Sequence, residues 1–173
     1  TGAVYPRELL REIGAWALRR GVAVISDEIY AALTYGAARH VSPLVAEPGL
    51  HATSTWIGGM SKAYAMTGWR MGFLAAPAAL AAAVGCMQSQ LASSPNAISQ
   101  HASLAALRGG AAEREQMRQA FAARAQIVVE ALRAIPGLDC PAPRGAFYVF
   151  PRLGAYLGRT DPGSGRCVRT GED

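Results

Sequence analysis

Lysine is almost absent from this chain of 173 residues. The sequence carries 17 basic residues, and all of them except Lys62 are arginine. Arginine stays protonated in proteins, whereas a lysine amine can lose its proton when it is desolvated and can then attack a carbonyl to form a Schiff base. Codon usage that favours arginine would also leave one lysine by chance, so its rarity alone assigns Lys62 no role.

Cysteine and histidine are scarce as well, with three of each. The cysteines, Cys86, Cys140 and Cys167, form no Cys-x-x-Cys pair and have no histidine at a ligand spacing. We therefore expect neither a metal site nor a disulfide framework. No signal peptide is visible and no apolar run reaches membrane length, so the expectation is a reduced, cytoplasmic setting without a membrane.

Basic runs are missing too, although the net charge is +5 and the pI is about 9.5. The arginines are scattered, and only Arg19 and Arg20 are adjacent. This distribution argues against nucleic-acid binding, and arginines that bind small anionic groups would explain the charge equally well. The length and the hydrophobic content of 51% predict a globular protein with a sizeable core.

Both ends of the chain have unusual patterns. The chain starts at Thr1-Gly2 without Met, and Thr170 is followed by an acid at Asp173, which is a helix-start signature. No apolar run follows that signature, so we interpret the chain as a fragment.

Apolar periodicity predicts an α/β fold, with helices alternating with a mostly parallel sheet. Helices are expected over 6–20, 77–90, 96–107 and 113–135, and strands over 22–26, 53–57, 70–76 and 145–151. Composition shifts near the end of the long helix, where a Pro-rich stretch follows. We accordingly divide the chain into residues 1–120, part of a large domain, and 121–173, the linking helix and the start of a small α+β domain.

Four residues suit different parts of pyridoxal phosphate. Asp27 and Tyr30 follow a predicted strand, where functional groups gather in α/β proteins. A carboxylate such as Asp27 can pair with the pyridine nitrogen, and a phenol such as Tyr30 can donate to the ring oxygen. Lys62 can form the Schiff base and then move the substrate α-proton. Arg70 can bind the phosphate with its planar fork.

Several motifs, in order along the chain, resemble the class I/II aminotransferases of pyridoxal phosphate fold type I. The likeness is closest to the bacterial aspartate/prephenate aminotransferase branch. It rests on residues 26–30 (SDEIY), 61–72 (SKAYAMTGWRMG), 88–96 and 145–151 (GAFYVFP), and Thr1-Gly2 resembles the end of the family's Asn-Pro-Thr-Gly motif.

The resemblance implies an activity and a site. The activity would be transfer of an amino group from an L-amino acid, with an aspartate-like one favoured, to a 2-oxo acid, in a homodimer. Lys62 matches the Schiff-base lysine, Asp27 the partner of the pyridine nitrogen, Tyr30 the partner of the ring oxygen and Arg70 the phosphate arginine. At Gly59 many relatives carry a phosphate-binding serine, so that contact is not expected here. The family's glycine-rich loop, ring-stacking aromatic and substrate-carboxylate arginine match no position of this chain.

Other interpretations are open at this stage. Taken singly, Asp27 fits a helix cap, Tyr30 a core residue and Arg70 a surface ion pair. Phe147 and Tyr148 fit core positions, His40 a surface or packing position, and Glu28 a structural role. A lyase or synthase of the same fold, or a non-catalytic ligand-sensing domain of a transcription regulator, would share the motifs. As a fragment, the chain alone is expected to be inactive.

Overall fold

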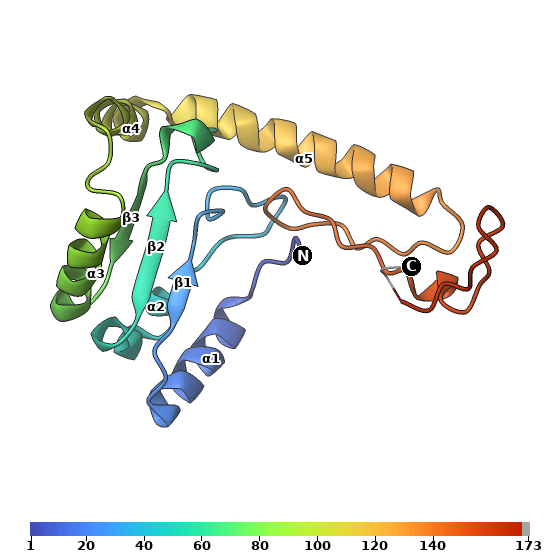
Figure 1. Ribbon diagram of the computed structural model, residues 1–173, viewed down its shortest axis with the longest axis horizontal. Coiled ribbons are helices and arrows are strands. Elements are labelled where there is room, and N and C mark those ends of the chain that lie inside the picture. Colours follow the sequence, from blue (N-terminus) through green and yellow to red (C-terminus); the bar gives the residue numbers. More distant parts are fainter. Residues whose placement is uncertain (171–173) are drawn as a thin grey trace.

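A three-stranded mixed sheet organises residues 1–170, the part of the chain that this computed structural model describes (Figure 1). Strand β1 (Ile25–Asp27) pairs in parallel with β2 (Thr55–Gly59), and β2 pairs antiparallel with β3 (Gly72–Ala75). The α/β class predicted from the sequence is confirmed. The described sheet is mixed rather than mostly parallel because the segment between β2 and β3 contains only the short 3-10 helix η2 (Thr67–Trp69), and a parallel return needs a longer crossover.

Helix α1 (Arg7–Arg20) covers one side of β1. It follows Pro6, whose fixed φ suits a helix start, and it ends at Gly21, where a left-handed φ of 63° lets the amide bond back to the helix. Its buried face contacts α2 (Pro43–Ala46) and the 3-10 helix η1 (Pro48–Ala52). The small core formed there consists of Ala17, Leu44 and Leu50, with Val24 and Trp56 packed against it.

Three further helices follow the sheet. They are α3 (Ala78–Leu91), α4 (Ala97–Gly109) and α5 (Ala111–Arg133), and the short 3-10 helix η3 (Gly154–Tyr156) comes after them. Asn96 caps α4 by accepting a hydrogen bond from the Ile98 amide at 2.8 Å. The predicted helices are therefore confirmed with small shifts at their ends. Helix α5 runs from α4 along one edge of the molecule to the C-terminal segment (Figure 1).

The predicted strand over 145–151 is wrong. Gly145 makes one isolated bridge, to Thr34, and Ala146 has a positive φ of 56°, which breaks the extended run. The backbone groups at this turn bond the loop after β1 instead of a neighbouring strand. The division into two domains near residue 120 stays a prediction. The helix start signalled at Thr170 depends on residues 171–173, which lie outside the described part.

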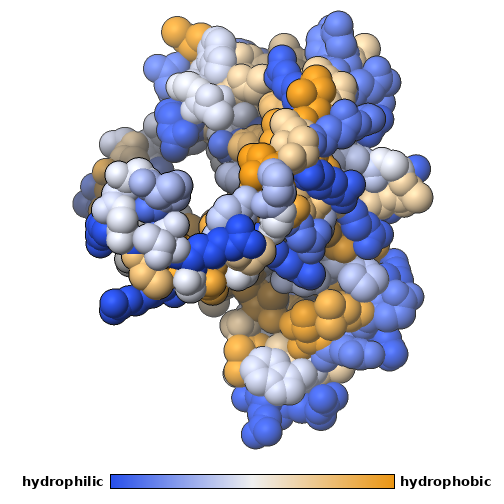
Figure 2. Space-filling model, turned by 90° about the vertical axis from the view of Figure 1, so that its right-hand side faces the viewer, coloured by the Kyte–Doolittle hydropathy of each residue, from blue (hydrophilic) through white to orange (hydrophobic). Residues whose placement is uncertain are grey.

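Large apolar side chains remain on the surface of several elements. Ile25 in β1, Leu91 at the end of α3 and Ile98 in α4 are exposed by 73%, 78% and 70%. Viewed from the side of the C-terminal segment, apolar groups interrupt the polar surface in separate patches (Figure 2). None of the helices within residues 1–170 has both the length and the apolar character that crossing a bilayer requires.

Helix α1 packs closely against its neighbours at Gly14. A methyl group there would lie 2.7 Å from Glu47 Cβ and 3.1 Å from Leu50 Cδ1, whereas a methyl group at Gly85 in α3 would meet nothing within 4 Å. We expect Gly14→Ala to lower the free energy of unfolding by about 1–3 kcal/mol through overpacking. Gly85→Ala, the matched control, should be neutral or stabilising by about 0.5–1 kcal/mol. Urea unfolding followed by circular dichroism measures both, and equal stability of the two variants would contradict the packing described here.

Candidate cofactor site

The strand register brings three of the predicted site residues to one edge of the sheet. Asp27 ends β1 and lies opposite Ile57 in the parallel strand β2, so the chain leaves both strands at the same edge. Lys62 follows shortly after the end of β2 at Gly59. Because β3 is antiparallel and starts opposite Gly59, Arg70 enters the sheet from this edge too.

The turn that carries Lys62 is anchored by Met60, which is fully buried. The Met60 amide donates to the Met71 carbonyl at 3.1 Å, and its own carbonyl accepts from the Tyr64 amide at 3.1 Å. Lys62 Nζ lies 5.4 Å from the centre of the Phe147 ring, a cation–π geometry that holds the amine against an aromatic face.

Gly59 leaves no room for a side chain. A Cβ at this position would lie 2.9 Å from Ile29 Cδ1 and 3.0 Å from the Met71 carbonyl oxygen. Glycine at this position therefore permits β2 to lie closer to Met71 and Ile29 than a larger residue would.

Asp27 and Tyr30 lie in the turn that follows β1. One oxygen of Asp27, Oδ1, accepts from the Ile29 amide at 3.1 Å, which shapes the turn. The Tyr30 hydroxyl is hydrogen-bonded to the Tyr148 hydroxyl at 2.7 Å. Burial, this hydrogen bond and the neighbouring charges of Tyr148 and Asp27 raise the pKa of Tyr30 to about 12. Tyr30 is consequently a neutral phenol near pH 7 and keeps a proton to donate.

Arg70 stands at the bend between η2 and β3, with a left-handed φ of 52°. Its Nη1 donates to the Thr67 carbonyl at 3.0 Å, and this is the single hydrogen bond of the guanidinium among residues 1–170. The exposed guanidinium keeps further N–H donors for an anion.

Two aromatic residues that the sequence placed in the core belong to this site. Phe147 and Tyr148 are exposed by 39% and 47%, and their rings lie 5.2 Å and 5.7 Å from that of Tyr30, edge-on in both cases. Phe147 also stacks on Phe121 of α5 at 5.3 Å. The Gly145-Ala146 pair before them signals a turn, and this was the local hint that the aromatic run is not a strand.

A cavity opens beside these residues, on the β1 side. Its lining includes Asp27, Tyr30 and Tyr148, while Lys62 and Arg70 lie outside it. Of the four predicted site residues, Asp27 and Tyr30 thus line this cavity.

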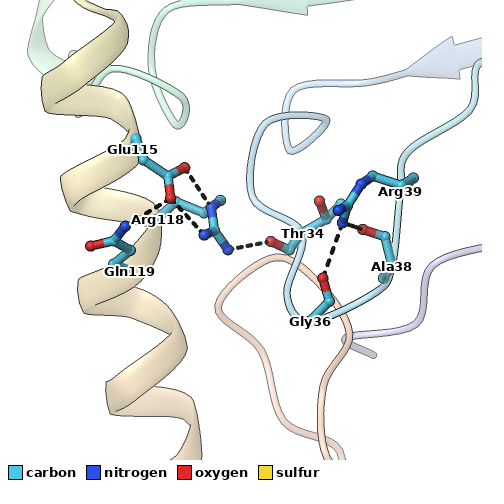
Figure 3. Close-up of polar contacts among 7 residues, drawn as sticks. All are labelled: Thr34, Gly36, Ala38, Arg39, Glu115, Arg118 and Gln119. Atoms are coloured by element: carbon cyan, nitrogen blue, oxygen red, sulfur yellow. Dashed lines mark hydrogen bonds and ion pairs between the residues drawn. The ribbon is translucent and has the colours of Figure 1, made fainter.

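Helix α5 holds the loop that follows Tyr30, as Figure 3 shows. Arg118 on α5 donates from Nη1 to the Thr34 carbonyl at 3.0 Å, and its other donors form a bidentate pair with Glu115 at 2.7 Å. Across the loop, Arg39 donates to the carbonyls of Gly36 and Ala38, at 3.0 Å and 2.8 Å. These contacts fasten the loop to the helix and to itself.

Glu28 lies next to Asp27 in sequence but has a structural role. Its carboxylate accepts from the Ser26 hydroxyl at 3.0 Å and is hydrogen-bonded to His40 Nε2 at 2.6 Å. His40 is exposed, as predicted, and in addition holds this carboxylate. Burial alone would raise the pKa of Glu28, but hydrogen bonding with Ser42, His40, Trp56 and Ser26 outweighs it and lowers the pKa. The carboxylate thus stays ionised behind the site.

Comparison with known proteins places the chain in a family. The model of the class I and II aminotransferases matches residues 1–162, so the chain belongs to that family. The aspartate aminotransferase of Geobacillus stearothermophilus is 45% identical over 87% of this chain and 38% of its own length. The aspartate/prephenate aminotransferase of Cereibacter sphaeroides is 39% identical over 97% of this chain and 42% of its own length.

Solved structures agree with this assignment. The crystal structure of the aspartate aminotransferase from Rhizobium meliloti superposes with a TM-score of 0.93 at 40% identity, over 98% of this chain and 42% of that one. The aspartate aminotransferase from Thermus thermophilus with maleate gives a TM-score of 0.82 at 35% identity, over 94% and 41%. The chain therefore spans about two fifths of the length of the relatives that it matches.

The Glu28 network gives a pH-dependent contribution to stability. Because the folded-state pKa lies below the ordinary value of 4.5, the carboxylate stabilises the fold above that pH, and this stabilisation is lost as the pH falls through the folded-state pKa. We expect Glu28→Gln to cost about 1–3 kcal/mol at pH 7, and the difference from the unmodified protein to shrink below pH 4.5.

Urea unfolding at a series of pH values measures this difference. Glu130→Gln is the control, since Glu130 is exposed on α5 and its side chain bonds only Gln126 among the described residues. Its effect should stay within about 0.5 kcal/mol. A cost of Glu28→Gln that does not change between pH 7 and pH 3 would refute the assignment of an ionised carboxylate.

Proposed function

We propose that this chain is part of a pyridoxal phosphate-dependent aminotransferase, which moves an amino group from an L-amino acid to a 2-oxo acid. The observation that carries the proposal is the gathering of Asp27, Lys62 and Arg70 at one sheet edge, with Tyr30 beside them. Membership of the aminotransferase family and relatives named aspartate aminotransferase support it, and favour an aspartate-like amino donor.

The residues present fit this cofactor. Pyridoxal phosphate offers an aldehyde, a ring nitrogen, a ring oxygen and a phosphate, and the edge offers an amine, a carboxylate, a phenol and a guanidinium. Each group keeps an unused polar atom among the described contacts: Asp27 commits Oδ1 to a backbone amide, and Arg70 commits one nitrogen to a carbonyl. When bound, the cofactor supplies a carbonyl that an amine can attack and a ring that accepts electrons.

Each of the four side chains would have a separate role toward the cofactor. Lys62 would hold the cofactor through its Nζ, and the same amine would move the proton of the substrate α-carbon. Asp27 would keep the ring nitrogen protonated by pairing with it, and Tyr30 would donate a hydrogen bond to the ring oxygen. Arg70 fixes the phosphate through charge-assisted hydrogen bonds.

The setting of the whole protein is part of the proposal. The family resemblance supports a homodimer, and the free thiols Cys86, Cys140 and Cys167 suit a reduced, cytoplasmic compartment. Nothing observed favours a lyase, a synthase or a regulator domain over transamination, since the relatives above carry the name of aminotransferases.

Lys62 is the residue on which the proposal is tested. In the intact protein with pyridoxal phosphate, we expect Lys62→Ala to abolish the visible absorption band of the lysine-bound cofactor and to lower transaminase activity by at least about 100-fold, because the covalent anchor and the proton carrier are both lost. Spectrophotometry and a coupled assay of amino transfer measure the two effects.

Lys62→Arg is the matched control, because it keeps the positive charge and removes the nucleophilic amine. It should fail as Lys62→Ala does. Borohydride reduction followed by mass spectrometry adds a direct readout, since Lys62 is the single lysine of this chain and should carry the label. Retained activity or a retained covalent band in Lys62→Arg would rule out the assigned role.

A further inference from the structure

The turn at residues 144–146 docks on the loop that follows Tyr30. The Ala146 amide donates to the Leu33 carbonyl at 2.8 Å, and the Tyr35 amide donates to the Arg144 carbonyl at 2.8 Å. The Tyr35 hydroxyl also donates to the carbonyl of Ala146. Three hydrogen bonds therefore tie two segments together that lie more than 100 residues apart in sequence.

The turn is tightly packed at Gly145. A Cβ there would lie 2.9 Å from the Leu33 carbonyl oxygen and 2.9 Å from Val4 Cγ2. The backbone thus approaches the loop as closely as a glycine allows, and the positive φ of Ala146 turns the next two side chains back toward the end of β1.

The two side chains after the turn reach different site residues. Phe147 lies against the Lys62 amine, 5.4 Å from Nζ to the ring centre. Tyr148 makes the hydrogen bond of 2.7 Å to the Tyr30 hydroxyl, from a ring set edge-on to that of Tyr30. In this hydrogen bond either hydroxyl can be the donor. The raised pKa of Tyr30 corresponds to Tyr30 donating to Tyr148, and the roles exchange when Tyr30 donates to another acceptor.

We propose that Tyr148 is a positioning residue for Tyr30: its hydroxyl donates to the Tyr30 oxygen and directs the Tyr30 proton toward the ring oxygen of the cofactor. A phenol has one proton and two lone pairs, so Tyr30 can accept from Tyr148 and donate to the cofactor at the same time. Hydrogen bonds arranged in such a chain polarise each other, which makes Tyr30 the stronger donor. The proposal rests on the proposed function, because it takes pyridoxal phosphate as the ligand of this edge.

The expected signature is a pH profile. A hydrogen-bond donor at the ring oxygen of the cofactor would stabilise the negative charge on that oxygen. It would therefore lower the pKa of the proton that the ring oxygen shares with the Lys62 nitrogen. Tyr30→Phe should therefore raise the midpoint of the pH titration of the bound cofactor's visible absorption. Tyr148→Phe should raise it in the same direction by about 0.3–1 pH unit, the size of effect that a single hydrogen bond supports.

The test uses the intact protein loaded with pyridoxal phosphate and a double-mutant cycle. Tyr148→Phe in the Tyr30→Phe background should add nothing, because Tyr148 acts through Tyr30. The matched control is Tyr156→Phe, which removes another hydroxyl, one that donates to the Pro136 carbonyl at 2.6 Å away from the site. Gly145→Ala keeps the Tyr148 hydroxyl but displaces the turn, and it should shift the midpoint in the same direction as Tyr148→Phe.

Three outcomes overturn the proposal, and they are distinguishable. A midpoint in Tyr148→Phe equal to that of the unmodified protein and of Tyr156→Phe removes the role of Tyr148. Additive shifts in the double variant show that Tyr148 acts without Tyr30. The absence of any visible band that depends on Lys62 refutes the proposed function itself, and the positioning role falls with it.

Discussion

The register between β1 and β2 is the constraint on which the candidate site depends. Two parallel strands end at the same edge, so pairing Asp27 with Ile57 decides that the turn after β1 and the turn after β2 open side by side. A slip of one residue would turn Asp27 to the other face of the sheet and separate it from Lys62. The antiparallel entry of β3 adds Arg70 to the same edge without any long connection.

Close packing holds this register. Met60 is completely buried below the turn, and β2 and β3 approach too closely at Gly59 for a side chain. The turn that carries Lys62 therefore packs directly against backbone atoms, and this close packing leaves the turn few alternative conformations. Directly after β1, the ionised Glu28 is hydrogen-bonded to His40 and to the Ser26 hydroxyl, and so fixes the end of the strand. Glu28 thus has a structural role, while its neighbour Asp27 belongs to the candidate site.

The sequence predicted what local patterns encode. Periodicity, Pro6, Gly21 and the apolar runs sufficed for the helices and, with bounds shifted by up to three residues, for the three strands. The strand-end motifs pointed to Asp27, Lys62 and Arg70. Contacts across long sequence separations could not be obtained in this way. Tyr148 meets Tyr30 across 118 residues, and an aromatic run such as that after Gly145 satisfies strand propensity equally well. Only the docking of the turn on the loop decides between the two.

The loop on which the turn docks is also held by the N-terminal part of α5. Arg118 on the helix and the turn at Ala146 contact the same loop, at Thr34 and at Leu33, so the loop after Tyr30 is held from two sides by elements that follow it in the chain. Closing so long a segment costs entropy, which has to be recovered by contacts of this kind. The Tyr30 hydroxyl finds its partner only when the turn is docked, so order in the C-terminal segment is coupled to order at the candidate site. Any ligand that binds Tyr30 in its docked position must therefore stabilise the contact between the turn and the loop by the same free energy with which docking favours the ligand.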